Sequence, residues 1–140
     1  MNKTYAAVVR LLARREYAVQ ELRTKLLQKG HEPTEIEAAL TRCIQAGYQS
    51  DQRYAEQLCR ARFMQGYGPL RVVQELHYQG VSPEVVQTVL ASDTWDWVSQ
   101  ARIVCERKSK KDSFLQRRLL WQRGFPAQMI DAALKSEETI

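Results

Sequence analysis

The chain has 140 residues, of which 44% are hydrophobic and 26% are charged, and it carries a formal net charge of +5. This length is about that of one domain, and the balance of apolar and charged residues excludes a wholly disordered chain. No apolar run approaches the roughly 20 residues that a membrane-spanning helix needs, and residues 1–6 lack the layout of a secretory signal. We therefore expect a cytoplasmic protein that does not associate with a membrane.

The charge is unevenly distributed along the chain. Residues 1–50 contain eight lysines and arginines against five acidic residues, residues 51–100 contain four against six, and residues 101–140 contain nine against five. Both ends are therefore basic, and the middle is slightly acidic. Such a distribution permits a polyanionic or acidic partner without requiring one.

The hydrophobic periodicity predicts helices only. Apolar residues recur at spacings of three and four, and no run alternates strictly between apolar and polar residues. We predict nine helices, at about residues 3–14, 18–29, 34–46, 51–65, 69–79, 83–91, 94–110, 112–123 and 127–137. Ser50 and Ser82 are expected to cap the fourth and sixth helices, and Asp93 or Thr94 is expected to cap the seventh.

One spacing pattern occurs three times with identical offsets. The copies are Leu26-Gly30-Ile36-Leu40, Leu76-Gly80-Val86-Leu90 and Leu120-Gly124-Ile130-Leu134. A proline follows each glycine by two or three residues, at Pro33, Pro83 and Pro126. Glycine readily takes the left-handed conformation that ends a helix, and proline is tolerated in the first turn of the next helix. Each copy therefore predicts a helix, a short corner and a second helix.

Grouping the nine helices in threes gives units at residues 1–48, 49–92 and 93–140. The predicted fold class is all-α, with three tandem three-helix repeats stacked into an elongated, curved body. Repeats of this kind favour a surface for a partner over a catalytic pocket.

Residues that could carry catalysis are few and scattered. There are two histidines, His31 and His77, and no recognised zinc-protease, serine-hydrolase or P-loop motif. The three cysteines, Cys43, Cys59 and Cys105, are far apart in apolar helical stretches, so we expect buried, reduced thiols. We therefore predict that the protein is not an enzyme and has no catalytic residue, metal site or cofactor.

The segment Gly66-Tyr67-Gly68-Pro69 predicts a sharp corner between the fourth and fifth helices. The interpretation that we favour is structural, with Tyr67 packed into the junction between two units. In the alternative, the corner presents Tyr67 to a partner beside Arg60, Arg62 and Arg71.

Basic and aromatic residues are interleaved between residues 102 and 123. The basic candidates for binding a partner or DNA are Arg107, Lys108, Lys110, Lys111, Arg117, Arg118 and Arg123, and Phe114 and Trp121 lie among them. This pattern suits a nucleic-acid surface, because phosphates bind cations and bases stack on rings. The alternative is a solvated charged face with Phe114 and Trp121 in the core, and we favour that alternative for Trp121 and, by a smaller margin, for the lysine cluster.

Six short stretches between residues 5 and 136 are informative when their order and spacing are taken together. They are Glu21-Leu22 with Lys25-Leu26 and Gly30, Ala46-Gly47-Tyr48, Asp51-Gln52-Arg53-Tyr54-Ala55, Gly66-Tyr67-Gly68-Pro69, Glu75-Leu76 with Gly80, and Phe114-Leu115 with Arg123-Gly124-Phe125. In this order and at these spacings the chain resembles the RecX family of bacterial regulatory proteins, which modulate the RecA recombinase. One departure is at Gln49-Ser50, where the family more usually has an apolar residue and an acid after the tyrosine.

The resemblance implies three tandem three-helix repeats in a cytoplasmic protein that is not an enzyme. It also implies binding within the groove of RecA filaments on DNA, with lower ATP hydrolysis, strand exchange and LexA cleavage, in DNA recombination, repair and the SOS response. The expected partner is thus the RecA filament, with DNA contacted as part of it, and we expect the protein itself to be a monomer. The alternative function is a helical module that binds DNA directly, without dependence on RecA.

Overall fold

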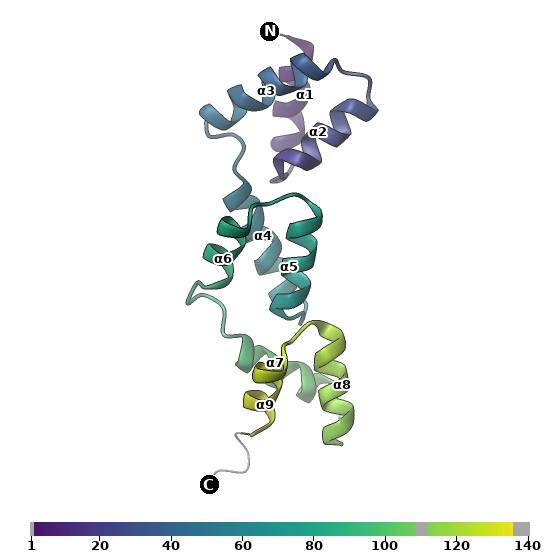
Figure 1. The fold of residues 1–140 in the computed structure, drawn as a ribbon, viewed down its shortest axis with the longest axis vertical. Coiled ribbons are helices and arrows are strands. Elements are labelled where there is room, and N and C mark those ends of the chain that lie inside the picture. Colours follow the sequence, from purple (N-terminus) through teal and green to yellow (C-terminus); the bar gives the residue numbers. More distant parts are fainter. Residues whose placement is uncertain (1, 109–111, 136–140) are drawn as a thin grey trace. The chain divides into compact units, whose positions relative to one another are not determined.

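The computed structural model describes residues 2–108 and 112–135, and these form helices with no strand (Figure 1). The helices are α1 (Lys3–Leu12), α2 (Val19–Gln28), α3 (Pro33–Gln45), α4 (Asp51–Met64), α5 (Pro69–Tyr78), α6 (Pro83–Leu90), α7 (Trp97–Arg107), α8 (Ser113–Arg123) and α9 (Ala127–Lys135). The predicted all-α class and its nine helices are thus confirmed within the described ranges. None of these helices is both long enough and apolar enough to span a membrane.

The chain folds into two compact units. The first comprises Met1–Gln57 and Leu76–Val86, and the second comprises Leu58–Glu75 and Gln87–Ile140. Helices α1–α3 therefore belong to the first unit and α7–α9 to the second, whereas α4, α5 and α6 are divided between them. The division into modules at 1–48, 49–92 and 93–140 stays a prediction.

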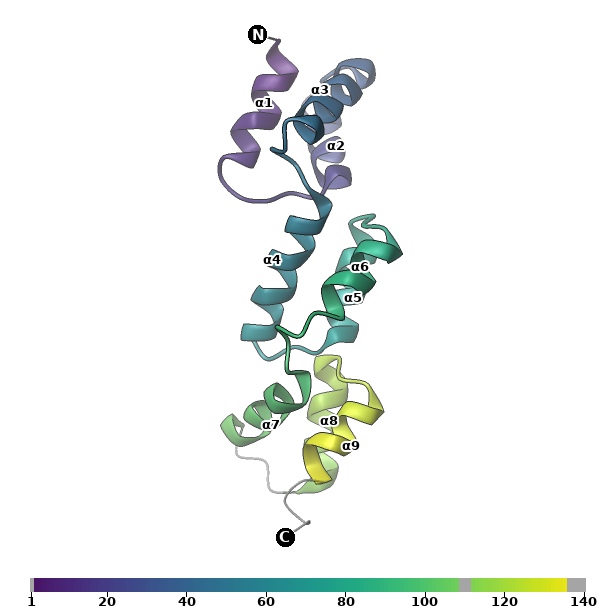
Figure 2. The same ribbon diagram turned by 90° about the vertical axis from the view of Figure 1, so that its left-hand side faces the viewer.

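In the first unit, α1 and α2 both pack against α3 (Figure 2). Their shared core consists of Tyr5, Val8, Tyr17, Leu22, Leu26, Ile36, Ala39, Leu40 and Cys43. In the second unit, α7 packs against α8 and α9, and these two helices also contact each other. The most deeply buried side chains of α8 and of the corner after it are Leu120 and Phe125. Each unit thus has an apolar core of its own.

The three glycines of the repeated pattern follow α2, α5 and α8 with positive φ angles of 87°, 75° and 97°. The residue after each glycine donates its backbone N–H to the carbonyl of the first leucine of the pattern. The donor and acceptor pairs are His31 to Leu26 (3.1 Å), Val81 to Leu76 (3.0 Å) and Phe125 to Leu120 (3.0 Å). This hydrogen bond defines the Schellman motif, and the spacing from leucine to glycine is the spacing that the motif requires.

The caps of three helices test the predicted starts. The Ser50 and Ser82 hydroxyls accept from the N–H groups of Arg53 and Val85 at 3.2 and 3.3 Å, so both predicted caps are confirmed. The prediction for the seventh helix is wrong, because Asp96, rather than Asp93 or Thr94, accepts from the Ser99 N–H at 3.0 Å.

The late start of α7 has a packing cause. Trp95 is buried, and its indole Nε1 donates to the Val89 carbonyl at 2.9 Å. The Ser92 hydroxyl accepts from the Thr94 N–H at 3.2 Å, which favours a turn over a helix at this point. The helix therefore begins only at Trp97, after the indole of Trp95 has been placed.

The α4–α5 corner and the α8–α9 corner contact each other through their backbones. The Gly68 N–H donates to the Arg123 carbonyl at 2.8 Å, and the Leu70 N–H donates to the Gly124 carbonyl at 3.0 Å. A Cβ atom on Gly68 would lie 2.5 Å from the Gly124 carbonyl carbon, and one on Gly124 would lie 2.8 Å from the Arg71 nitrogen. Both corners therefore require glycine for close approach.

The three cysteines are buried and reduced, as predicted. Burial raises the pKa of the Cys59 thiol to about 12, although the nearby Arg60 guanidinium acts in the opposite direction. Burial also raises the pKa of the Cys43 and Cys105 thiols. Thiols of this kind are poor nucleophiles, because the reactive form is the thiolate.

Replacing Gly124 by alanine should destabilise the protein more than replacing Gly30 by alanine. Both glycines follow a helix with positive φ, but a Cβ on Gly30 meets nothing within 4 Å. We expect Gly30→Ala to cost about 1 kcal/mol for backbone strain, and Gly124→Ala to cost a further 1–3 kcal/mol or so from overpacking. Urea unfolding followed by circular dichroism measures both. Equal losses in the two variants would contradict the close contact between the corners.

The three thiols should be alkylated by iodoacetamide only when the protein unfolds. At pH 8, a pKa raised from 9.0 to about 12 lowers the thiolate fraction of Cys59 about a thousandfold. The native protein should therefore stay unlabelled in mass spectra, whereas the same protein in urea should gain three adducts. Rapid labelling of Cys59 under native conditions would show that this thiol is accessible.

Candidate functional site

Tyr67 lies at the α4–α5 corner between two arginines. The Arg71 guanidinium carbon is 4.1 Å from the centre of the Tyr67 ring, and that of Arg123 is 5.1 Å away. Arg123 also donates from Nη1 to the Gln65 carbonyl at 3.2 Å. The half-buried Tyr67 ring is therefore covered by cations from α5 and α8, within the junction of the two glycine corners.

Two other predicted residues on α4 have intramolecular partners. Arg62 forms an ion pair with Glu75, with 2.7 Å between Nε and Oε2, and the Arg62 side chain is only 26% exposed. This pair joins α4 to α5. The Arg60 guanidinium lies 5.3 Å from the centre of the Trp95 ring. Both arginines thus help to hold their own unit together. Their guanidinium groups are already engaged by Glu75 and by the Trp95 ring, so they are less available to a partner.

Phe114 and Trp121 are exposed on α8. Their exposed fractions are 68% and 64%, so the favoured interpretation that Trp121 lies in the core is wrong, and the core alternative also fails for Phe114. The physical reason is the narrow buried side of this helix, where Leu120 alone among Ser113–Arg123 is fully buried. Phe114, Arg117 and Trp121 recur at intervals of three and four, and therefore share a second, solvent-facing side.

The charged residues around this face differ in their contacts. Arg117 donates from Nη1 to Asp131 Oδ1 at 2.6 Å, in a pair whose side chains are 51% and 61% exposed. Such an exposed pair contributes little to stability. Arg118 is exposed beside it, and Arg107 and Lys108 are exposed at the end of α7. Lys110 and Lys111 lie outside the described residues.

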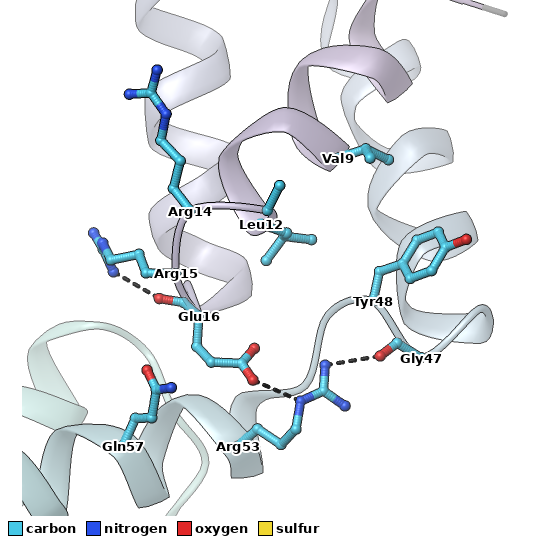
Figure 3. A pocket seen from close by; sticks show the side chains of 10 residues that line it. Val9, Leu12, Arg14, Arg15, Glu16, Gly47, Tyr48, Arg53 and Gln57 are labelled. Carbon is cyan, nitrogen blue, oxygen red and sulfur yellow. Dashed lines mark hydrogen bonds and ion pairs between the residues drawn. The ribbon is translucent and has the colours of Figure 1, made fainter.

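A shallow cavity in the first unit escaped the sequence analysis (Figure 3). Its volume is about 460 Å³, and the end of α1, the loop after it, Gly47, Tyr48 and the start of α4 line it. Across this cavity, Arg53 donates to Glu16 and to the Gly47 carbonyl, each at 2.8 Å. These contacts tie α4 to the loop after α1.

A tyrosine at the α1–α2 corner also escaped the sequence analysis. Tyr17 has the Arg15 guanidinium 3.6 Å from its ring centre, much as Arg71 covers Tyr67. The signal was present in the sequence, because Tyr17 and Tyr67 are 50 residues apart, as are Gly30 and Gly80. The tyrosine thus recurs at the same offset, whereas its covering arginine comes from two residues before Tyr17 and from four residues after Tyr67.

In the part of the chain that the structure describes, no three histidine, cysteine or acidic side chains gather as a metal site would require. The arrangement offers instead an aromatic and basic face on α8 and a corner of tyrosine and arginine. Both are suited to recognition by contact.

Comparisons with known proteins agree with the repeat. Family models for the first and the second three-helix domain of RecX match residues 5–43 and 50–90. The regulatory protein RecX of Legionella pneumophila is 41% identical over 142 residues, covering 96% of this chain and 95% of the relative. That of Halorhodospira halophila is 37% identical, covering 91% of this chain and 83% of the relative.

A solved structure shows the same fold. The crystal structure of RecX from Lactobacillus salivarius matches with a TM-score of 0.84 at 19% identity, covering 99% of this chain and 96% of that one. The sequence identity to the curated relatives extends over nearly the whole chain. The chain therefore belongs to the RecX family of regulatory proteins, which are not enzymes.

Proposed function

We propose that this protein binds the RecA filament on DNA and lowers its ATP hydrolysis, and with it strand exchange and LexA cleavage. Membership of the RecX family supports a regulatory role of this kind. The single observation that carries the proposal is the exposed face of α8, formed by Phe114, Arg117, Arg118 and Trp121. We call these four residues the α8 face.

The chemistry of the α8 face suits a protein partner. Tryptophan and arginine are enriched among the residues that dominate the binding energy of protein interfaces. Phe114 and Trp121 are separated by two helical turns, or about 10 Å at 1.5 Å per residue. Two large rings exposed on one charged helix have apolar surface that a partner can remove from water. The α8 face can therefore supply two anchors with arginines beside them.

A regulator can slow a filament by favouring one of its states. Binding shifts a conformational equilibrium only by the difference between the affinities for the two states. If the protein binds RecA protomers more tightly in one relative orientation, it stabilises that orientation against the movement that accompanies hydrolysis. Inhibition in this mechanism needs contacts and no catalytic group.

Replacing both Phe114 and Trp121 by alanine should weaken inhibition of RecA ATP hydrolysis on single-stranded DNA at least tenfold. The reason is the loss of two anchors, each worth about 2 kcal/mol at a typical interface hot spot. The measurement is the concentration of protein that halves the hydrolysis rate. Both side chains are mostly exposed, so the circular dichroism spectrum and the urea midpoint should not change.

Tyr78→Ala is the matched control for this double variant. Tyr78 is an aromatic residue of α5 with an exposed fraction of 85%, and its removal should leave inhibition unchanged. Parent-like inhibition by the double variant would refute the role of the α8 face. No inhibition by the parent protein at any ratio to RecA would refute the proposed function itself.

Neutralising Lys108, Lys110, Lys111, Arg117 and Arg118 together should slow association with the filament. Charges at the rim of an interface act mainly on the association rate, and their effect is screened by salt. The variant should therefore inhibit less well at low salt and approach the parent as the salt concentration rises. Equal inhibition by variant and parent at low salt would show that the basic residues do not contribute.

A further inference from the structure

We infer that a basic groove along α1 binds the phosphate backbone of a single nucleic-acid strand. Lys3 and Arg10 of α1 and Arg14, in the turn after α1, line this groove together with Lys29 and His31, which follow α2. Its volume is about 320 Å³. We call these five residues the α1 groove. They belong to the first unit, and the inference concerns a ligand other than the RecA protein.

The spacing of the α1 residues places their charges in a row. Lys3 and Arg10 are seven residues apart and so share one side of the helix, and Arg14, in the turn that follows, lines the same groove. The opposite side is committed to the core through Tyr5 and Val8. At 1.5 Å per residue, Lys3 and Arg10 are about 10 Å apart along the helix. Ala7 lies within the row, and its small side chain leaves the groove open.

The second wall of the groove is held in place by hydrogen bonds. His31 Nδ1 lies 2.9 Å from the hydroxyl of Thr4, and that hydroxyl is 3.3 Å from a Glu35 carboxylate oxygen. Thr4 itself is only 1% exposed. The His31 N–H also closes the corner after α2 through the Leu26 carbonyl. His31 is therefore fixed beside α1 by the folded core, and Lys29 lies two residues before it.

The positive charge of the groove is not neutralised by its own lining. No carboxylate is among the residues that line it in the described part of the chain. Elsewhere in this unit, Glu21 and Glu16 pair with Arg15 and Arg53 at 2.7 and 2.8 Å. Arg14 extends away from the Glu16–Arg53 pair (Figure 3). Its charge is thus directed away from the acids that neutralise the neighbouring cavity.

The composition of the groove favours a phosphate chain over the other polyanionic partners. Its apolar lining is limited to Ala7 and Leu11, with no aromatic ring that could anchor a protein. A membrane surface would need an apolar face for insertion, and that face of α1 is packed against α3. A small anion would use one or two of the cations, whereas a strand carries charge along the whole row. Binding to such a strand gains free energy from counterion release.

Replacing Arg10, Arg14 and Lys29 by alanine tests the inference. The measurement is fluorescence anisotropy of a labelled oligothymidylate at several salt concentrations, without RecA. Each lost phosphate contact lowers the slope of log K against log salt by about 0.7 for a single strand, so the triple variant should lose about 2. Its affinity should fall more than tenfold. All three side chains are exposed, so the urea midpoint should stay the same.

A second triple variant with Lys25, Arg42 and Lys135 replaced by alanine is the matched control, because these residues lie in neither the α1 groove nor the α8 face. It lowers the net charge from +5 by the same three units, and it should keep oligothymidylate affinity within about threefold of the parent. Equal losses in the two triple variants would assign binding to net charge and overturn the inference. Absence of salt-dependent binding by the parent would also overturn it.

Two further measurements complete the test. The first is the affinity of poly-glutamate for the parent and for the first triple variant. If poly-glutamate binds the parent as tightly as the oligothymidylate does, and the triple variant loses both to the same extent, the groove binds an acidic protein segment and the inference is overturned. The variant lacking Phe114 and Trp121 should bind the oligothymidylate like the parent. This variant should lose RecA inhibition and keep oligothymidylate binding. The two readouts therefore test the two proposals independently.

Discussion

Three hydrogen bonds of one kind shape this protein: each runs from the residue after a corner glycine to a leucine carbonyl five positions earlier. Because the glycine takes a positive φ, the chain reverses within a few residues, and α3 packs against α2 as α9 packs against α8. The bond at His31 keeps Lys29 beside α1, and the bond at Phe125 holds Gly124 against the corner at Gly68. The position of Lys29 and the contact between the Gly68 and Gly124 corners therefore depend on the positive φ angles that glycine allows.

The two candidate surfaces differ in chemistry because the helices that present them bury different amounts of surface. Helix α1 buries Thr4, Tyr5 and Val8 and leaves a polar, cationic side with small apolar residues. Helix α8 fully buries Leu120 alone and leaves two aromatic rings in water. Aromatic rings with arginines suit a protein surface, whereas a row of cations without rings suits phosphates. The surface that we propose for RecA and the one that we propose for a nucleic-acid strand thus differ in chemistry.

The arginines illustrate how one residue type serves structure and recognition. Arg62 and Arg53 each pair with a glutamate and join two segments of their unit. Arg71 and Arg123 cover the Tyr67 ring, where the attraction between a cation and the ring adds to the contact between corners. Membership of a family of regulatory proteins agrees with this use of side chains, because regulation by contact requires charged surfaces on a stable frame and no reactive group.

The sequence by itself determined the helices, the glycine corners, the serine caps of α4 and α6 and the burial of the cysteines, because these depend on periodicity and on local backbone chemistry. Its resemblance to the RecX family also held over nearly the whole chain. Only the tertiary structure decided that Trp121 faces solvent, that Asp96 caps α7, and that Arg62 pairs with Glu75. It alone brought Lys29 and His31 beside the cations of α1. The physical reason is that periodicity shows which residues share a side of a helix, whereas burial and pairing depend on which neighbour covers that side.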